Sequence, residues 1–161
     1  RIGAGDLAEK LSEFWPARGP RWDALGYSDA HDALLVEAKA HISELFSTPS
    51  RARPDSQALI KSSLIKTQEY LRAKPRVPWT DVFYQLGNRL AHLHFLREHG
   101  KNAWLVLVNI VGDREMNGPG SRSEWEAAYK VAWHVLGLRE NHPLSRYIIH
   151  AYVPIGELHP P

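Results

Sequence analysis

The sequence predicts an α/β domain in which helices flank a mixed central β-sheet. Segments with apolar residues at helical spacing alternate with short apolar segments that have the period of a strand. Residues 104–111 are nearly all apolar, which is typical of a central strand covered on both faces. Residues 21–27 and 33–41 are separated by a short polar stretch, as in a hairpin. This order of elements places helices on both faces of the sheet.

The chain is expected to begin with a helix that is followed by the hairpin. Residues 5–15 carry leucine and aromatic side chains at helical spacing, Asp6 suits the N-cap, and Pro16 ends the helix. The two strands of the hairpin then cover about residues 21–27 and 33–41.

Two long helices are expected in the middle of the chain. Residues 47–55 are rich in proline, serine and arginine, which predicts an exposed loop. One helix should run from Asp55 to about Arg72, and a second over about 81–99, closed by Gly100. The positions of the second helix that we expect in the core are Val82, Leu86, Leu90 and Leu93, with Phe95 or Leu96.

The C-terminal part of the chain completes the alternation. The buried strand at 104–111 is followed by a loop over 112–121, a helix over about 123–136 and a last strand over 146–153. These elements complete the predicted mixed sheet.

Composition limits the class of protein. A chain of 161 residues with 43% hydrophobic and 24% charged residues has the size and composition of a single globular domain, which we take to span 1–161. The net charge of +2 does not by itself indicate a polyanionic partner. The absence of cysteine excludes disulfides and thiolate metal ligands. No apolar run approaches the roughly 20 residues of a membrane-spanning helix. We therefore expect a soluble cytoplasmic protein with no membrane partner.

The hairpin carries the residues with the clearest chemical pattern. Side chains alternate along a strand, so Glu37, Lys39 and His41 should share one face. If the chain turns near residue 30, Asp23 lies opposite Glu37. Opposed residues have Cβ atoms about 4.5 to 5.5 Å apart, which is close enough for two carboxylates to share one divalent cation. The sequence therefore predicts a metal site with a lysine beside it.

These residue types suit phosphodiester hydrolysis. Mg²⁺ prefers oxygen ligands and keeps several waters, so Asp23, Glu37 and a backbone carbonyl would suffice to hold it. A bound metal lowers the pKa of water and stabilises charge on a phosphoryl oxygen. The ammonium of Lys39 adds electrostatic stabilisation of the transition state.

The order of helix, hairpin with Asp on one strand and Glu-x-Lys on the next, helix and strand resembles the PD-(D/E)XK nuclease superfamily. The resemblance covers about residues 5–111, and Trp22 stands where the name-giving proline would be. It implies a restriction-endonuclease-like core, a magnesium or manganese ion on Asp23 and Glu37, and Lys39 acting on the attacking water. It also implies a helix-borne glutamate, for which the candidates are Glu9 and Glu13, and a polar residue on a later helix, for which Gln85 is the candidate.

A nucleic-acid partner requires basic residues near this site. Arg18 and Arg21 precede Asp23, and Arg51 and Arg53 lie in an inserted basic loop and helix at about 47–76. Arg89 belongs to a helix whose polar side is a candidate to face the cleft. That polar side contains Gln85, Asn88, Arg89 and His92 at spacings of three and four, and plain solvent exposure explains it equally well. The sequence does not decide whether the protein forms a homodimer.

Alternative interpretations remain at this point. Glu37 and Lys39 are also consistent with a solvated ion pair on an edge strand. His41 suits a third ligand or a surface histidine, and the later histidines do not form the H-E-x-x-H zinc pattern. The hypotheses are a metal-dependent nuclease, a non-catalytic relative of that fold that binds nucleic acid or protein, and an α/β domain in which the charged trio is incidental.

Overall fold

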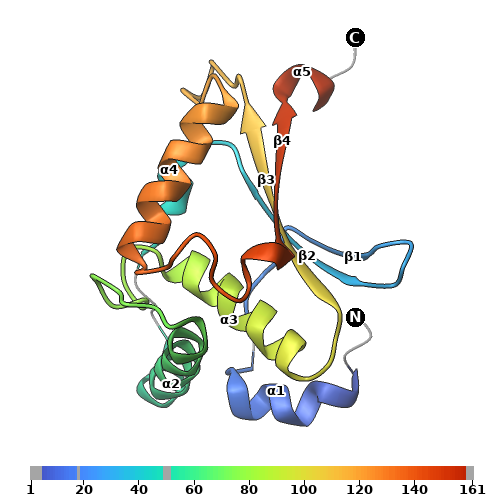
Figure 1. Cartoon of the computed structure of the whole chain (residues 1–161), viewed down its shortest axis with the longest axis vertical. Coiled ribbons are helices and arrows are strands. Elements are labelled where there is room, and N and C mark those ends of the chain that lie inside the picture. The colour runs from blue at the N-terminus through green and yellow to red at the C-terminus, as the bar shows by residue number, and fades with distance from the viewer. Residues whose placement is uncertain (1–4, 18, 49–51, 159–161) are drawn as a thin grey trace.

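The computed structural model describes residues 5–17, 19–48 and 52–158 and contains a four-stranded mixed sheet. The strands are β1 (Ala24–Tyr27), β2 (Ala33–Lys39), β3 (Ala103–Val111) and β4 (Ile148–Pro154), in the spatial order β1-β2-β3-β4 (Figure 1). β1 is antiparallel to β2, and the other neighbouring pairs are parallel. The prediction of an α/β fold with a mixed central sheet is confirmed.

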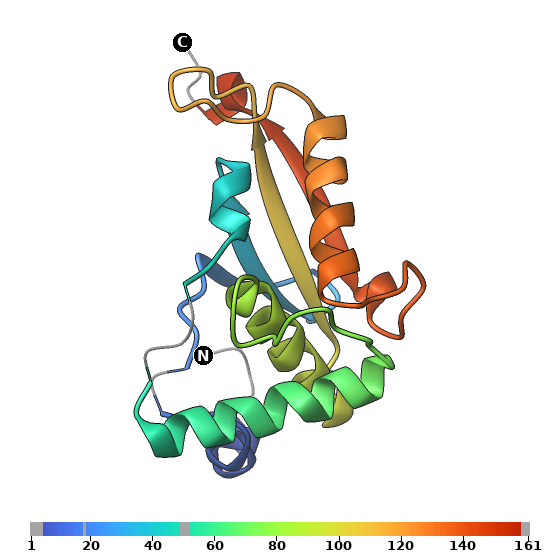
Figure 2. The same ribbon diagram turned by 90° about the vertical axis from the view of Figure 1, so that its left-hand side faces the viewer.

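The helices gather on one face of the sheet. They are α1 (Ala8–Phe14), α2 (Pro54–Leu71), α3 (Tyr84–Glu98), α4 (Arg122–Val135) and the short C-terminal α5 (Ile155–Leu158). In Figures 1 and 2, α3 and α4 lie directly over the strands. α1 lies beyond the C-terminal end of α3, and α2 lies along the side of α3. Among the described residues no helix covers the opposite face, so the prediction of helices on both faces is wrong.

Burial along β2 and β3 follows the same asymmetry. Alternate residues of β2, from Ala33 to Lys39, are buried under the helices, and Leu34, Val36 and Ala38 between them are only half-buried. β3 shows the same alternation from Ala103 onwards. On the open face the side chain of Ile149 in β4 keeps 42% of its surface exposed. The apolar run at 104–111 indicated a central strand correctly, but apolarity alone does not show which face is covered.

Local sequence explains where the long helices end. α2 stops at Leu71 because Arg72 adopts the left-handed conformation, with φ of 53°. α3 ends as predicted, since Gly100 has φ of 73° and the Lys101 amide donates to the carbonyl of Leu96 over 2.9 Å. α3 begins at Tyr84, three residues later than expected, and Val82 is 42% exposed, so its predicted burial is wrong.

The core lies between α3, α4 and the covered face of the sheet. Leu90 and Leu93 of α3, Leu105 of β3 and Trp125 of α4 are fully buried. α2 packs against α1 and α3. The described residues also contain three 3₁₀ turns, η1 (Gly5–Leu7), η2 (Ile42–Leu45) and η3 (Ser145–Tyr147). In the described part of the chain, no helix has both the length and the apolarity that crossing a bilayer requires.

Candidate functional site

The hairpin brings Asp23 and Glu37 to opposite positions on neighbouring segments. β1 pairs with β2 in the register Ala24 to Val36, so Asp23, the residue before β1, lies across from Glu37. This register agrees with the prediction from the position of the turn. The alternation along β2 places Glu37 and Lys39 together on the covered face.

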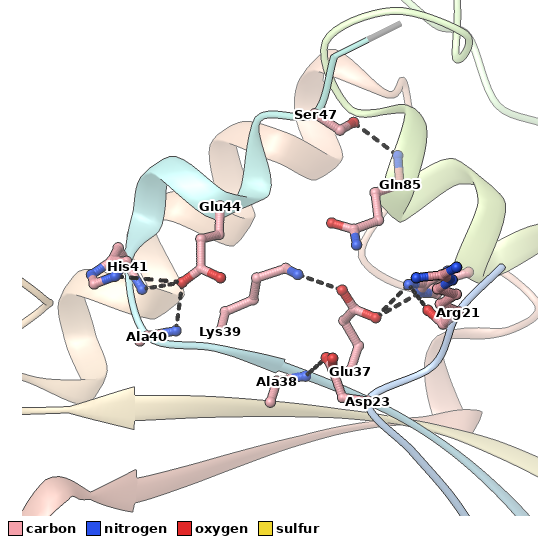
Figure 3. Close-up of polar contacts among 11 residues, drawn as sticks. Arg21, Asp23, Glu37, Ala38, Lys39, Ala40, His41, Glu44, Ser47 and Gln85 are labelled. Atoms are coloured by element: carbon pink, nitrogen blue, oxygen red, sulfur yellow. Dashed lines mark hydrogen bonds and ion pairs between the residues drawn. The ribbon is translucent and has the colours of Figure 1, made fainter. Parts of the chain in front are cut away.

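The carboxylate of Asp23 lies at the edge of the sheet. Its Oδ2 accepts a hydrogen bond from the backbone amide of Ala38 over 2.8 Å, and the residue is exposed. Figure 3 shows this contact at the strand, and it shows the Glu37 carboxylate directed toward Lys39. Among the described residues, the Ala38 amide is the one donor to the Asp23 side chain. Oδ1 is therefore available to another partner.

Glu37 is the centre of a buried ion-pair network. The residue is 3% exposed, and its Oε1 accepts a hydrogen bond from Nζ of Lys39, which is 8% exposed. Its Oε2 accepts from Nε of Arg89 over 2.7 Å and lies 2.6 Å from the Nη2 atom of that guanidinium. Two cationic groups therefore contact one carboxylate, and the carboxylate of Glu44 lines the same cavity.

Arg89 is fixed by three kinds of contact. Besides the paired contact with Glu37, its Nη2 donates to the backbone carbonyl of Arg21 over 2.8 Å. Its guanidinium carbon lies 4.4 Å from the centre of the Trp22 ring, within the range of a cation–π contact. Arg89 is 3% exposed, so the structure gives it the role of a buried partner of Glu37 in place of the predicted contact with nucleic acid.

Further polar side chains enclose the trio. A cavity of about 10 Å³, about the room of one water, is lined by Glu37, Lys39, Glu44, Gln85, Arg89 and Tyr129, among others. The predicted residue Gln85 lies in the first turn of α3, and its side chain points toward Lys39 and Glu37 (Figure 3). Burial, and to a smaller degree the charge of Glu37, raises the pKa of Tyr129, so its hydroxyl remains protonated.

Glu44 and Tyr129 were missed by the sequence reasoning. Glu44 Oε1 accepts from the backbone amides of Ala40 and His41, each over 2.8 Å, and so turns the chain into η2 at the end of β2. The sequence signal for it was the spacing of His41 and Glu44, which form a capping box. Tyr129 carried no local signal, because α4 reaches the site only through the tertiary fold. His41 is half-buried at this cap.

The structure does not bring the glutamates of the first helix to Glu37. Glu9 and Glu13 are exposed on α1, and Glu13 lines a hollow with residues of α2 and with His99 near the C-terminal end of α3. Arg89, the partner of Glu37, lies near the other end of α3. In the described part of the chain, no group of three or more histidine, cysteine or acidic residues is placed to hold a metal ion.

The predicted basic residues are dispersed. Arg21 is exposed beside Asp23, and Arg53 is exposed before the first turn of α2. Arg18 and Arg51 lie outside the described residues. The polar side of α3 is buried, since Asn88 is 6% and His92 is 8% exposed, so the alternative of a solvent-facing surface is wrong for these two residues.

The fold and the site define a mixed α/β protein with a buried, doubly ion-paired glutamate beside an exposed aspartate. Comparison with protein-family models, with curated proteins and with solved structures gives no match. The functional argument therefore depends on the chemistry of the site itself.

Proposed function

We propose that this protein is a metal-dependent nuclease that hydrolyses phosphodiester bonds in nucleic acid, with Asp23, Glu37 and Lys39 at its active centre. The observation that supports this most directly is the placement of the three side chains. Asp23 lies opposite Glu37 on the neighbouring segment, and Lys39 contacts Glu37 on the same face of β2. The proposed cofactor is Mg²⁺ or Mn²⁺.

The donor set suits a hard divalent cation. Mg²⁺ in proteins uses one or two carboxylates and keeps several of its waters. Asp23 is exposed with one oxygen available, and Glu37 supplies the second carboxylate, so these two residues would hold the ion. When bound, the metal supplies a Lewis acid and lowers the pKa of a coordinated water.

The cationic groups beside Glu37 suit a phosphate. Lys39 and Arg89 both contact the Glu37 carboxylate, and the ammonium of Lys39 would attract an anionic phosphoryl oxygen. Lys39 would stabilise negative charge that develops on that group in the transition state. Arg89 would act as a positioning residue, because its paired contact with Oε2 fixes the orientation of Glu37.

A calorimetric titration with MnCl₂ tests the metal site without a substrate. We expect the wild type to bind Mn²⁺ and Asp23→Asn to lose that binding. Asp29→Asn removes another exposed aspartate of the same hairpin and is the matched control. The asparagine side chain still accepts a hydrogen bond from Ala38, so loss of binding would not report loss of the fold. Equal binding by wild type and Asp23→Asn would contradict the proposed ligand.

Cleavage is tested with end-labelled single- and double-stranded oligonucleotides. We expect cleavage with Mg²⁺ or Mn²⁺, none with EDTA, and a loss of about 10²- to 10³-fold for Lys39→Ala, the size of effect seen when one electrostatic group of a transition state is removed. Lys61→Ala, on the exposed side of α2, is the control for a general loss of charge. Unchanged metal-dependent cleavage by Lys39→Ala would overturn the role of the lysine.

A specific observation favours a second candidate, a non-catalytic nucleic-acid-binding domain. Glu37 is buried and already neutralised by two cations, and a metal would have to compete with Lys39 for its Oε1. This candidate predicts no Mn²⁺ binding and no cleavage, but binding of a short duplex or single strand that weakens steeply with added salt. The titration above and a salt series in a fluorescence-anisotropy assay separate the two candidates.

A further inference from the structure

A second cavity lies next to the candidate active centre, between α1, α3 and the hairpin. Its volume is about 430 Å³, within the range of small-molecule sites. The wall is mainly apolar and aromatic and includes Leu11, Trp15, Trp22, Leu35 and Phe95. A planar apolar ring would be well accommodated between such side chains.

His92 supplies a polar group to this wall. It is 8% exposed, and its Nδ1 lies 3.0 Å from the carbonyl of Asn88, so Nδ1 carries the proton and Nε2 is an acceptor. A side chain added at Gly19, on the rim of the cavity, would come within 3.9 Å of Nε2. Among the described residues no group donates to Nε2. Burial lowers the pKa of His92 to about 4, so it stays neutral and keeps this acceptor at physiological pH.

The cavity and the active centre share a wall. Trp22 lines the cavity, precedes Asp23 in the chain, and lies against the guanidinium of Arg89 that binds Glu37. A group bound against Trp22 therefore lies next to Asp23, the following residue in the chain. The Arg89 side chain, which contacts both Trp22 and Glu37, connects the cavity to Glu37. A nucleotide has the corresponding arrangement, because its planar base is linked through a sugar to its phosphate.

We propose that this cavity takes an unpaired nucleobase of the nucleic acid whose phosphate lies at Asp23 and Glu37, an inference that rests on the proposed function. The ring would pack against Trp15 and Trp22, and an N–H of the base would donate to Nε2 of His92. Enzymes that act on extruded or single-stranded bases combine aromatic packing with hydrogen bonds to the edge of the base. An aliphatic ligand would offer no donor to Nε2, whereas the N–H of a base would satisfy this acceptor.

The test uses a single-stranded DNA oligonucleotide that contains one 2-aminopurine, in EDTA so that no cleavage occurs. Stacking in the cavity should quench the 2-aminopurine fluorescence in the wild type. Ala8→Trp fills the cavity from its exposed rim, and Glu9→Trp places the same side chain on the next, exposed position outside it. We expect Ala8→Trp to weaken binding about tenfold or more, as loss of one stacked base does, and Glu9→Trp to leave it unchanged.

Each result of this experiment decides one point. Three results would overturn the base-binding cavity. They are the absence of quenching, equal affinities of the two tryptophan variants, and an unchanged affinity for an oligonucleotide with an abasic site in place of the 2-aminopurine. A melting curve of each variant by circular dichroism checks that it is folded, and His92→Phe, which keeps a ring but lacks Nε2, should also weaken binding. Quenching without metal-dependent cleavage would support the cavity and refute the nuclease, and cleavage without quenching would do the reverse.

Discussion

The contact between Arg89 and Glu37 gives a quantitative test of the buried site. Arg89→Met removes the guanidinium but keeps a long apolar side chain, so the packing volume changes little. Both residues are 3% exposed, and removing one partner of a buried ion pair typically costs about 3 to 5 kcal/mol. Lys39 still contacts the Glu37 carboxylate in this variant, so we expect the lower end, about 3 kcal/mol of the free energy of unfolding.

Arg122→Met is the matched control for this substitution. The Nε atom of Arg122 lies 2.6 Å from Oε1 of Glu126, but the side chains of that pair are 70% and 41% exposed. Water screens such a pair, and exposed pairs contribute only about 0.2 to 1 kcal/mol. A third variant, Arg89→Lys, keeps the charge without the planar fork and should lie between the wild type and Arg89→Met.

Urea unfolding followed by circular dichroism measures these differences in the free energy of unfolding. An equal dependence on urea concentration in all variants shows that the same folded and unfolded states are compared. The double variant Glu37→Gln with Arg89→Met gives the coupling energy between the two side chains, which we expect to be favourable and within about 0.5 to 3 kcal/mol. If Arg89→Met cost no more than Arg122→Met, the Glu37 site would be effectively hydrated. The interpretation of Glu37, Lys39 and Arg89 as a dry, buried ion-pair network would then be refuted.

Two further predictions concern His92 and a glycine at a close contact. Burial lowers the pKa of His92 from 6.5 to about 4, so the unfolded chain binds more protons than the folded chain between these pH values. Through this group the free energy of unfolding should fall by about 3 kcal/mol from pH 7 to pH 4. In His92→Phe, the free energy of unfolding from urea denaturation should fall by about 3 kcal/mol less over the same pH range. A slope that is the same in both proteins would contradict the neutral histidine. Gly137 and Gly100 both have φ of 73°, but a Cβ at Gly137 would lie 2.0 Å from the carbonyl carbon of Lys74, and one at Gly100 would meet nothing within 4 Å. Gly137→Ala should therefore lower the free energy of unfolding by well more than the roughly 1 to 2 kcal/mol that the left-handed backbone conformation costs in Gly100→Ala. Equal losses of the two variants in urea unfolding would show that the segment at Lys74 moves freely.

The sequence was sufficient for the elements and the hairpin register because these depend on local patterns. The polar stretch at 28–32 and period-two alternation define the hairpin, and the position of its turn determines that Asp23 opposes Glu37. The layer arrangement was not predictable in the same way. An apolar strand such as 104–111 is compatible with one covered face or two, and the helix connections that decide this are long-range.

The same distinction explains what was missed at the site. Arg89 is 52 residues from Glu37 in the chain, and its position in a polar stripe of α3 was equally consistent with a cleft or with solvent. Because this side of α3 is buried, Arg89 contacts Glu37 and His92 lines the aromatic cavity. An isolated surface pair of Glu37 and Lys39 would need no third charge, whereas the buried pair has further charged neighbours, Arg89 on Glu37 and Glu44 in the same cavity. Binding of an anionic group beside Lys39 would compete with Glu37 for the ammonium and release Glu37 Oε1 for another cation. Phosphate and metal should therefore bind cooperatively at this site. A titration in which phosphate weakened Mn²⁺ binding by more than its own complexation of the ion explains would contradict this cooperativity.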